Sequence, residues 1–154
     1  MKTSGSAPPF LLIGYGNSLR GDDAAGYRLA LDMEKEALPD LRCIAVHQLT
    51  PELAADLAAA RHVFFADARP TQPQAPDLVI EAVTTESPNS VASHGCSPQA
   101  LLQLAKTLYH TCPSAQIIGI IAHDFRLGES MTESTRHAIN AARDWIRNTV
   151  TGHA

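Results

Sequence analysis

The strongest structural signal in this chain is the segment Phe10-Leu-Leu-Ile-Gly-Tyr-Gly-Asn-Ser-Leu-Arg-Gly-Asp-Asp-Ala-Ala-Gly-Tyr-Arg28. Its first four residues are apolar, a run that is too short for a helix and suits a buried strand. Gly14 and Gly16 interrupt the run and allow the backbone to turn sharply. Asp22 and Asp23 then precede a helical pattern, where acidic side chains are favoured. The segment therefore predicts a strand, a glycine loop and a helix, with two carboxylates at the end of the loop.

The glycine loop does not match the common nucleotide-binding motifs. A dinucleotide fingerprint needs a third glycine, but position 19 is leucine, and the two acids would repel a pyrophosphate. A P-loop is excluded because no Gly-Lys-Ser/Thr follows. Carboxylates at the end of a strand suit a cation better. The simpler alternative, in which Asp22 caps the helix and Asp23 is solvated, stays open on this segment alone.

Length and composition predict an ordinary globular domain in a reducing compartment. The 154 residues are 45% apolar and 18% charged, and the formal net charge of −4 argues against a nucleic-acid binder. The three cysteines have no spacing typical of a disulfide framework or a zinc site. No apolar run is long enough for a membrane span. We expect a disordered lead-in over 1–9, a single α/β catalytic domain over 10–150, a tail over 151–154, and a cytoplasmic location.

The rest of the chain alternates predicted strands with predicted helices. Further strands are expected at 41–47, 63–66 (ending on Asp67), 78–83 (near a sheet edge) and 116–122. Helices are expected to begin at Thr50-Pro51, at Ser97-Pro98 and at a capping box formed by Ser130 and Glu133. This order predicts a three-layer α/β/α sandwich, with a mostly parallel sheet of about five strands and helices on both faces.

Ligands of such sheets bind at the carboxyl ends of the strands, so the polar residues there are candidates. They are Asn17, Asp22, Asp23, His47, Gln48, Asp67, His123 and Asp124. Asp23, Asp67 and the loop residue His94 could meet at this edge, and two carboxylates with one imidazole suit nickel or zinc. On the residues alone, a turn-capping Asp67 and a solvent-facing His94 remain alternatives.

Several motifs resemble the hydrogenase maturation endopeptidases, which trim a C-terminal extension from the large subunit of nickel–iron hydrogenases. The first is Gly14-Tyr-Gly-Asn-Ser-Leu-Arg-Gly-Asp-Asp-Ala-Ala-Gly26; the others are Phe-Phe-Ala-Asp67-Ala, Ser-His94-Gly and Phe125-Arg-Leu-Gly-Glu. Gln48-Leu-Thr-Pro-Glu resembles the branch that processes soluble, bidirectional NAD-linked hydrogenases. The likeness extends from Phe10 to Val150.

The resemblance implies that Asp23, Asp67 and His94 form the catalytic, metal-recognising set. It implies nickel supplied by the substrate, no organic cofactor and a nickel-loaded large-subunit precursor as partner. Many family members have glutamate where this chain has Asp23, and a glycine where it has Ala24. We expect a monomer. A bridging bond to the substrate's nickel would restrict processing to precursor that contains the metal.

Two rival functions and two ambiguous residues remain at this stage. Cys96 lies two positions from His94 and near a predicted helix N-terminus, so a cysteine hydrolase is one rival. The other is a chaperone that binds the subunit or its metal without cutting. Asn17 and Gln48 are possible substrate contacts. The alternatives are a structural role for Asn17 in a tight turn and a solvent-facing position for Gln48.

Overall fold

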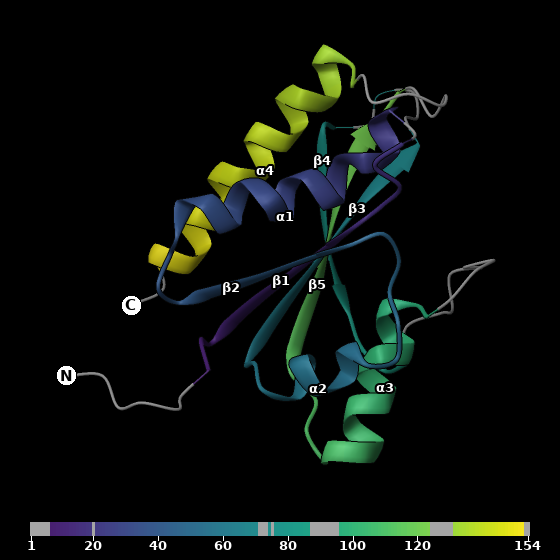
Figure 1. Ribbon diagram of the computed structural model, residues 1–154, viewed down its shortest axis with the longest axis vertical. Coiled ribbons are helices and arrows are strands. Elements are labelled where there is room, and N and C mark those ends of the chain that lie inside the picture. Colours follow the sequence, from purple (N-terminus) through teal and green to yellow (C-terminus); the bar gives the residue numbers. More distant parts are fainter. Residues whose placement is uncertain are drawn as a thin grey trace.

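The computed structural model describes residues 7–19, 21–70, 74, 76–86, 96–123 and 131–152. Five strands and four α-helices follow the predicted alternation (Figure 1). They are β1 (Phe10–Tyr15), the 3-10 turn η1 (Gly21–Ala24), α1 (Ala25–Glu36), β2 (Leu41–Val46), α2 (Leu53–Ala58), β3 (His62–Pro70), β4 (Leu78–Val83), α3 (Pro98–Tyr109), β5 (Ser114–Ala122) and α4 (Glu133–Thr151).

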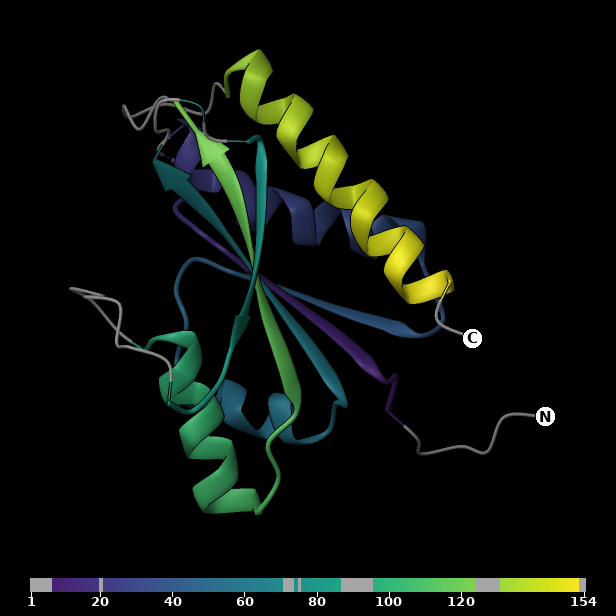
Figure 2. The same ribbon diagram turned by 180° about the vertical axis from the view of Figure 1, so that it is seen from behind.

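The strands form one sheet in the order β2-β1-β3-β5-β4. Every pairing is parallel except that of β4 with β5, which is antiparallel and lies at the edge. Helices α1 and α4 cover one face and α2 and α3 the other, and the view from behind shows the same layers (Figures 1 and 2). The predicted three-layer sandwich and the edge position of strand 78–83 are confirmed.

Burial on both faces explains why the central strands are apolar without interruption. Along β1, Phe10 and Leu12 pack in the cluster under α1 and α4, whereas Leu11 and Ile13 pack in the cluster under α2 and α3. The helices contribute apolar stripes to the same clusters. The stripe of α1 is Ala25, Leu29 and Met33, as the helical spacing predicts, and that of α4 ends on Ile146 and Val150.

Two of the three predicted helix starts are wrong. Helix α2 begins at Leu53 after Glu52, because residues 50–52 form a turn in which the Thr50 hydroxyl donates to the Glu52 carboxylate at 3.0 Å. Helix α4 is capped by Thr132, whose hydroxyl accepts the Thr135 N–H at 3.3 Å, so Glu133 is the first helical residue rather than the third. Ser130 lies outside the described residues. The predicted start at Ser97 is confirmed, because its side chain accepts the Ala100 N–H.

Close packing of α1 on the sheet depends on two glycines. A Cβ at Gly14 would collide with the Gly26 carbonyl oxygen, and one at Gly26 would collide with the Ala66 carbonyl oxygen. The first turn of α1 therefore lies directly against the backbone of β1 and β3. Ala24, where the family more often has glycine, has φ −81°, which suits alanine without strain. The beginning of α1 is thus held at the carboxyl ends of β1 and β3.

Within the described residues, none of the helices combines the length and the apolar character needed to cross a membrane.

Candidate functional site at the carboxyl ends of β1 and β3

The candidate site lies where the strand order reverses. From β1 the chain passes through α1 to β2 on one side, and from β2 it returns through α2 to β3 on the other side of β1. The two connecting helices cover opposite faces, so the carboxyl ends of β1 and β3 form the topological switch point at which α/β sheets bind ligands. The ends of β3 and β5 and the beginning of α1 gather at this end of the molecule (Figure 1).

Asp67 lies inside β3 rather than after it, so the predicted end of this strand is wrong. β3 continues to Pro70 because β5 is long enough to pair with it, with Asp67 opposite Gly119. On its other side β3 pairs with β1, and this pairing ends at Gly14 and Ala66, one residue before Asp67. Asp67 is therefore the first residue of β3 beyond β1, and its side chain faces the switch point from a rigid strand.

The environment of Asp67 favours its protonated form. Burial, followed by the negative charge of Asp23, raises the pKa of Asp67 to about 6. The Ala68 N–H, the positive charge of Arg69 and the Tyr15 hydroxyl oppose this rise. Asp23 and Asp67 are thus close enough to repel each other. Two repelling carboxylates in a partly desolvated position are typical of a site that gains from binding a cation or a proton.

Tyr15 is a member of the site that the sequence analysis did not identify. Burial, together with the charge of Asp67, raises the pKa of the Tyr15 hydroxyl well above its usual range, so it remains protonated. A protonated hydroxyl can donate to the Asp67 carboxylate. The signal was present in the alternation of β1, because Leu11, Ile13 and Tyr15 share one face, and parallel pairing places that face beside Asp67.

The glycine loop positions Asp23. The backbone N–H of Asn17 donates to the Asp23 carboxylate at 3.2 Å, while the Asn17 side chain accepts the Leu19 N–H at 2.9 Å. Gly16 has φ +151°, and a Cβ there would collide with the Asp23 carbonyl oxygen. The side chain of Asn17 therefore shapes the turn, as the structural alternative predicted. Its role as a substrate contact stays a prediction.

Asp22 does not cap α1, contrary to the simpler alternative. Helix α1 follows Ala24 and has no side-chain cap. Asp22 is fully buried, and its carboxylate accepts the His123 N–H at 2.8 Å and both the N–H and the hydroxyl of Thr132, at 2.7 and 2.8 Å. Burial acts to raise the pKa of Asp22, but these bonds outweigh it and hold the pKa below its ordinary value. Asp22 therefore joins the glycine loop to the end of β5 and the start of α4.

The remaining candidates have different outcomes. His94 and Asp124 lie outside the described residues, so their predicted roles stay predictions. Gln48 is exposed just beyond β2. His47 is also exposed, its Nε2 is 3.3 Å from the Ser18 hydroxyl, and its ring lies 5.1 Å from that of Tyr27. Among the described residues, which exclude His94, no three His, Cys, Asp or Glu side chains form a group able to hold a metal.

Cys43 and Cys96 are both half-buried against the apolar clusters. All three cysteines are free thiols, and Cys96 packs against the cluster under α2 and α3. Burial, with a smaller contribution from Glu34 and Glu36, raises the pKa of the Cys43 thiol to about 12. Cys43 therefore lacks the thiolate that nucleophilic catalysis requires.

Carboxyl-carbon NMR titration should show that Asp67 has a pKa near 6 in the wild type. Asp23→Asn should lower this pKa because it removes the repelling charge, and Tyr15→Phe should raise it because it removes a donor to the charged form. Asp56→Asn, which alters a surface ion pair with Arg42, serves as the control and should leave it unchanged. A wild-type value near 4, the reference for an exposed aspartate, would show that neither burial nor Asp23 raises the pKa of Asp67.

Solved structures of hydrogenase maturation proteases share this fold. The [NiFe] hydrogenase maturation protease HycI from Thermococcus kodakarensis superposes with a TM-score of 0.77 and 21% identity, over 96% of this chain and 95% of the other. For the hydrogenase maturating endopeptidase HybD from E. coli the TM-score is 0.66 at 23% identity, and the match covers 94% of this chain and 93% of the other. A hydrogenase 2 maturation peptidase from a Thaumarchaeota archaeon has a TM-score of 0.64 at 23% identity, and the match covers 92% of this chain and 97% of the other.

No protein-family model matches the chain, and no curated protein matches it. The resemblance to the hydrogenase maturation endopeptidases that the motifs indicate is thus confirmed in the fold, over nearly the whole chain.

Proposed function

We propose that the protein is an endopeptidase that removes the C-terminal extension of a nickel–iron hydrogenase large subunit after nickel insertion. The observation that carries this proposal is the position of Asp67 and the nearby charge of Asp23 at the switch point of a fold shared with hydrogenase maturation proteases. His94 completes the proposed set, and nickel enters as part of the substrate. The branch for soluble NAD-linked hydrogenases, the cytoplasmic location and the monomeric state belong to the same proposal.

The electrostatics of the carboxylate pair explain how nickel would be recognised. Burial is the main reason why the pKa of Asp67 is raised, and repulsion from the charged Asp23 raises it further. A divalent ion between them would remove the repulsion and replace water that the half-buried Asp67 has lost. Metal-free precursor offers no such compensation. Binding would therefore discriminate between the two precursor forms at the point where the extension is to be cut.

The same residues suit hydrolysis of the peptide bond. A carboxylate whose pKa lies near 6 is ionised at neutral pH and basic enough to accept a proton from water. In this proposal Asp67 orients the attacking water, accepts its proton as the hydroxide oxygen bonds to the carbonyl carbon, and passes that proton to the leaving nitrogen as the C–N bond breaks. The protonated Tyr15 hydroxyl holds the carboxylate in place. Asp23, anchored by the Asn17 N–H, keeps the second oxygen ligand in position.

A non-cleaving chaperone for hydrogenase assembly would use the same carboxylates, and intact mass spectrometry separates the two functions. Purified large-subunit precursor is incubated with the protein, and the mass of the subunit is recorded before and after. An endopeptidase shortens the subunit by the mass of its extension and releases the extension as a peptide. A stable complex with an unchanged subunit mass would replace the protease by the chaperone.

Cys96→Ala should keep at least half of the wild-type rate of precursor trimming, because the half-buried thiol packs against the apolar cluster and takes no part in the proposed reaction. The trimming rate follows from a gel time course, and circular dichroism confirms that the variant folds. Cys112→Ala, which alters an exposed thiol, serves as the matched control. A folded Cys96→Ala variant without activity would favour the cysteine-hydrolase rival.

A further inference from the structure

Among the described residues, ion pairs join α1 and α4 at one end of their contact. At the C-terminal end of α1, the Glu36 carboxylate forms ion pairs with Arg143 at 3.1 Å and with Arg147 at 2.8 Å. At the other end, Arg28 of α1 and Arg136 of α4 are both exposed. Within the part of the chain that the structure describes, no carboxylate pairs with either of these two guanidinium groups.

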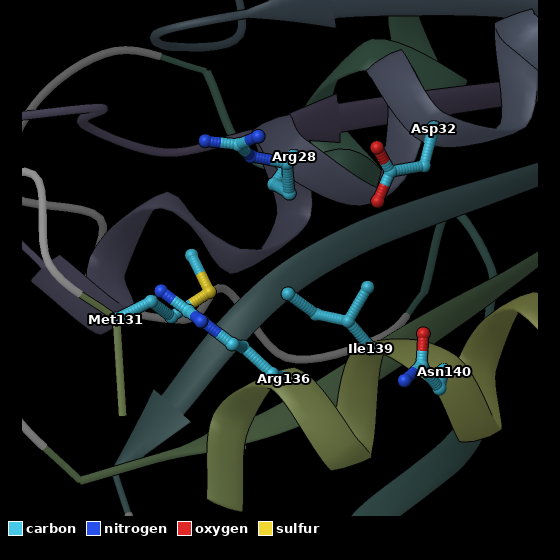
Figure 3. A pocket seen from close by; sticks show the side chains of 6 residues that line it. All are labelled: Arg28, Asp32, Met131, Arg136, Ile139 and Asn140. Carbon is cyan, nitrogen blue, oxygen red and sulfur yellow. The ribbon is translucent and has the colours of Figure 1, made fainter. Parts of the chain in front are cut away.

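These two arginines flank a cavity of about 270 Å³, which is lined by Arg28, Asp32, Met131, Arg136, Ile139 and Asn140. Figure 3 shows Arg28 and Arg136 extending toward the same end of the cavity, beside Met131. Asp32 and Asn140 lie at the opposite end, and the Ile139 side chain lies between the two groups. The cavity is therefore cationic at one end, apolar in the middle, and polar at the other end.

A second cavity of about 220 Å³ adjoins the first, since Arg28 and Met131 line both. Its other lining residues are Ser18, Ala24, Tyr27 and Leu31. Ser18 belongs to the glycine loop and follows Asn17, whose N–H holds the Asp23 carboxylate. The two cavities together, called here the α1/α4 groove, run from the loop that positions the carboxylate pair to Asn140.

The charge of the groove selects an anionic partner. Arg28 and Arg136 each lie in the first turns of their helices, where the unpaired N–H groups add positive potential. Among the described residues no carboxylate pairs with these two guanidinium groups, so they offer bidentate sites for an external carboxylate. Met131 and the buried Ile139 suit an apolar side chain, and the Asp32 carboxylate and Asn140 amide suit backbone N–H groups. Carboxylate, apolar side chain and amide together describe a peptide.

We propose that the α1/α4 groove binds an acidic segment of the hydrogenase large-subunit precursor, with its carboxylates between Arg28 and Arg136. This inference rests on the proposed function, because it identifies the segment as part of the same substrate. A peptide bond held at the carboxylate pair leaves the adjoining chain beside Ser18, at the mouth of the groove. Selection of one cognate subunit then follows from the acidic segment as well as from nickel.

Charge reversal tests this proposal through binding and kinetics. Arg28→Glu and Arg136→Glu should each raise the Kd for the nickel-loaded precursor about tenfold, equivalent to about 1.4 kcal/mol. The KM for trimming should rise in parallel while kcat stays near the wild-type value, because the groove binds the substrate away from the reacting bond. Arg28→Lys and Arg136→Lys should lose less affinity for the precursor than the Glu variants, since they keep the positive charge. Arg61→Glu, an exposed arginine at the amino end of β3, is the matched control.

Photocrosslinking identifies the bound segment independently of activity. Benzoylphenylalanine replaces Asn140, an exposed residue at the far end of the groove, and mass spectrometry locates the crosslinked precursor peptide. Crosslinks to an acidic segment, together with the tenfold loss in the Glu variants, support the proposal. Unchanged binding in both Glu variants, or crosslinks confined to neutral or basic segments, overturns it. A wild-type protein that binds the precursor but never shortens it refutes the proposed endopeptidase, while the binding data still decide the groove.

Discussion

Asp67→Asn should give a protein that folds normally, is more stable than the wild type at pH 7–8, and no longer trims nickel-loaded precursor. The amide keeps the size of the side chain, but it lacks the charge and the basicity that the proposed reaction needs. We expect the trimming rate to fall about a hundredfold or more, as for the loss of one group that stabilises a transition state. An Asp67→Asn variant that trims at the wild-type rate would remove Asp67 from the site.

The gain in stability follows from the direction of the pKa shift. The folded-state pKa of Asp67 is raised to about 6, so ionisation of this group costs folding free energy. The free energy of unfolding therefore falls as the pH rises from the unfolded-state pKa of about 4 through the folded-state pKa. Asp67→Asn removes that penalty and should raise the free energy of unfolding by about 1–3 kcal/mol at neutral pH. Urea unfolding of both proteins at pH 4 and pH 8 measures this gain. The free energies of unfolding of the variant and the wild type should be equal at pH 4.

Asp22→Asn should destabilise the protein by about 1–3 kcal/mol, a sizeable part of the stability of a typical domain. One carboxylate oxygen becomes an NH₂ group, which would face the N–H of His123 or of Thr132 in a buried position. The loss arises from buried donors that are left unpaired rather than from a lost helix cap, because Asp22 does not cap α1. Urea unfolding at pH 7 measures the change. A loss below about 1 kcal/mol would show that the buried bonds contribute little.

A surface control and the pH dependence make the Asp22 prediction specific. Asp144→Asn alters an exposed ion pair with Arg147 on α4 and should cost well under 1 kcal/mol. Because the pKa of Asp22 is lowered in the folded state, its stabilisation is present at neutral pH. It is lost as the pH falls below the ordinary aspartate value through the lowered one. The wild type should therefore lose stability in acid more steeply than Asp22→Asn does.

Much of the fold could be predicted because local signals and global topology agree. The apolar run before Gly14, the alternation of strands and helices, and the cap at Ser97 all point to the observed sandwich. Two of the errors lie where distant segments decide the structure. The end of β3 depends on the length of its partner β5, which cannot be inferred from the sequence of β3 itself. The start of α4 depends on Thr132, which also binds Asp22 from the glycine loop.

The candidate site was predictable in part for the same reason. Placement after strands identified Asp23 and Asp67, because parallel strands bring their carboxyl ends together. The different roles of Asp22 and Asp23 were not predictable, since adjacent acids look alike in sequence. Only their neighbours separate them, with Thr132 and His123 binding Asp22, and Asn17 holding Asp23 beside Asp67. The α1/α4 groove also depends on two helices that lie far apart in the sequence, α1 ending at Glu36 and α4 beginning at Glu133.

The nickel dependence of precursor trimming tests the central claim most directly. One preparation of the large-subunit precursor is divided into a nickel-loaded and a nickel-free sample, and each is incubated with the wild-type protein at pH 7.5. Intact mass spectrometry then follows the subunit over time. The proposed recognition of nickel by Asp23 and Asp67 predicts loss of the C-terminal extension from the nickel-loaded sample only. Equal rates of trimming in both samples, or an unchanged mass in both, would contradict it.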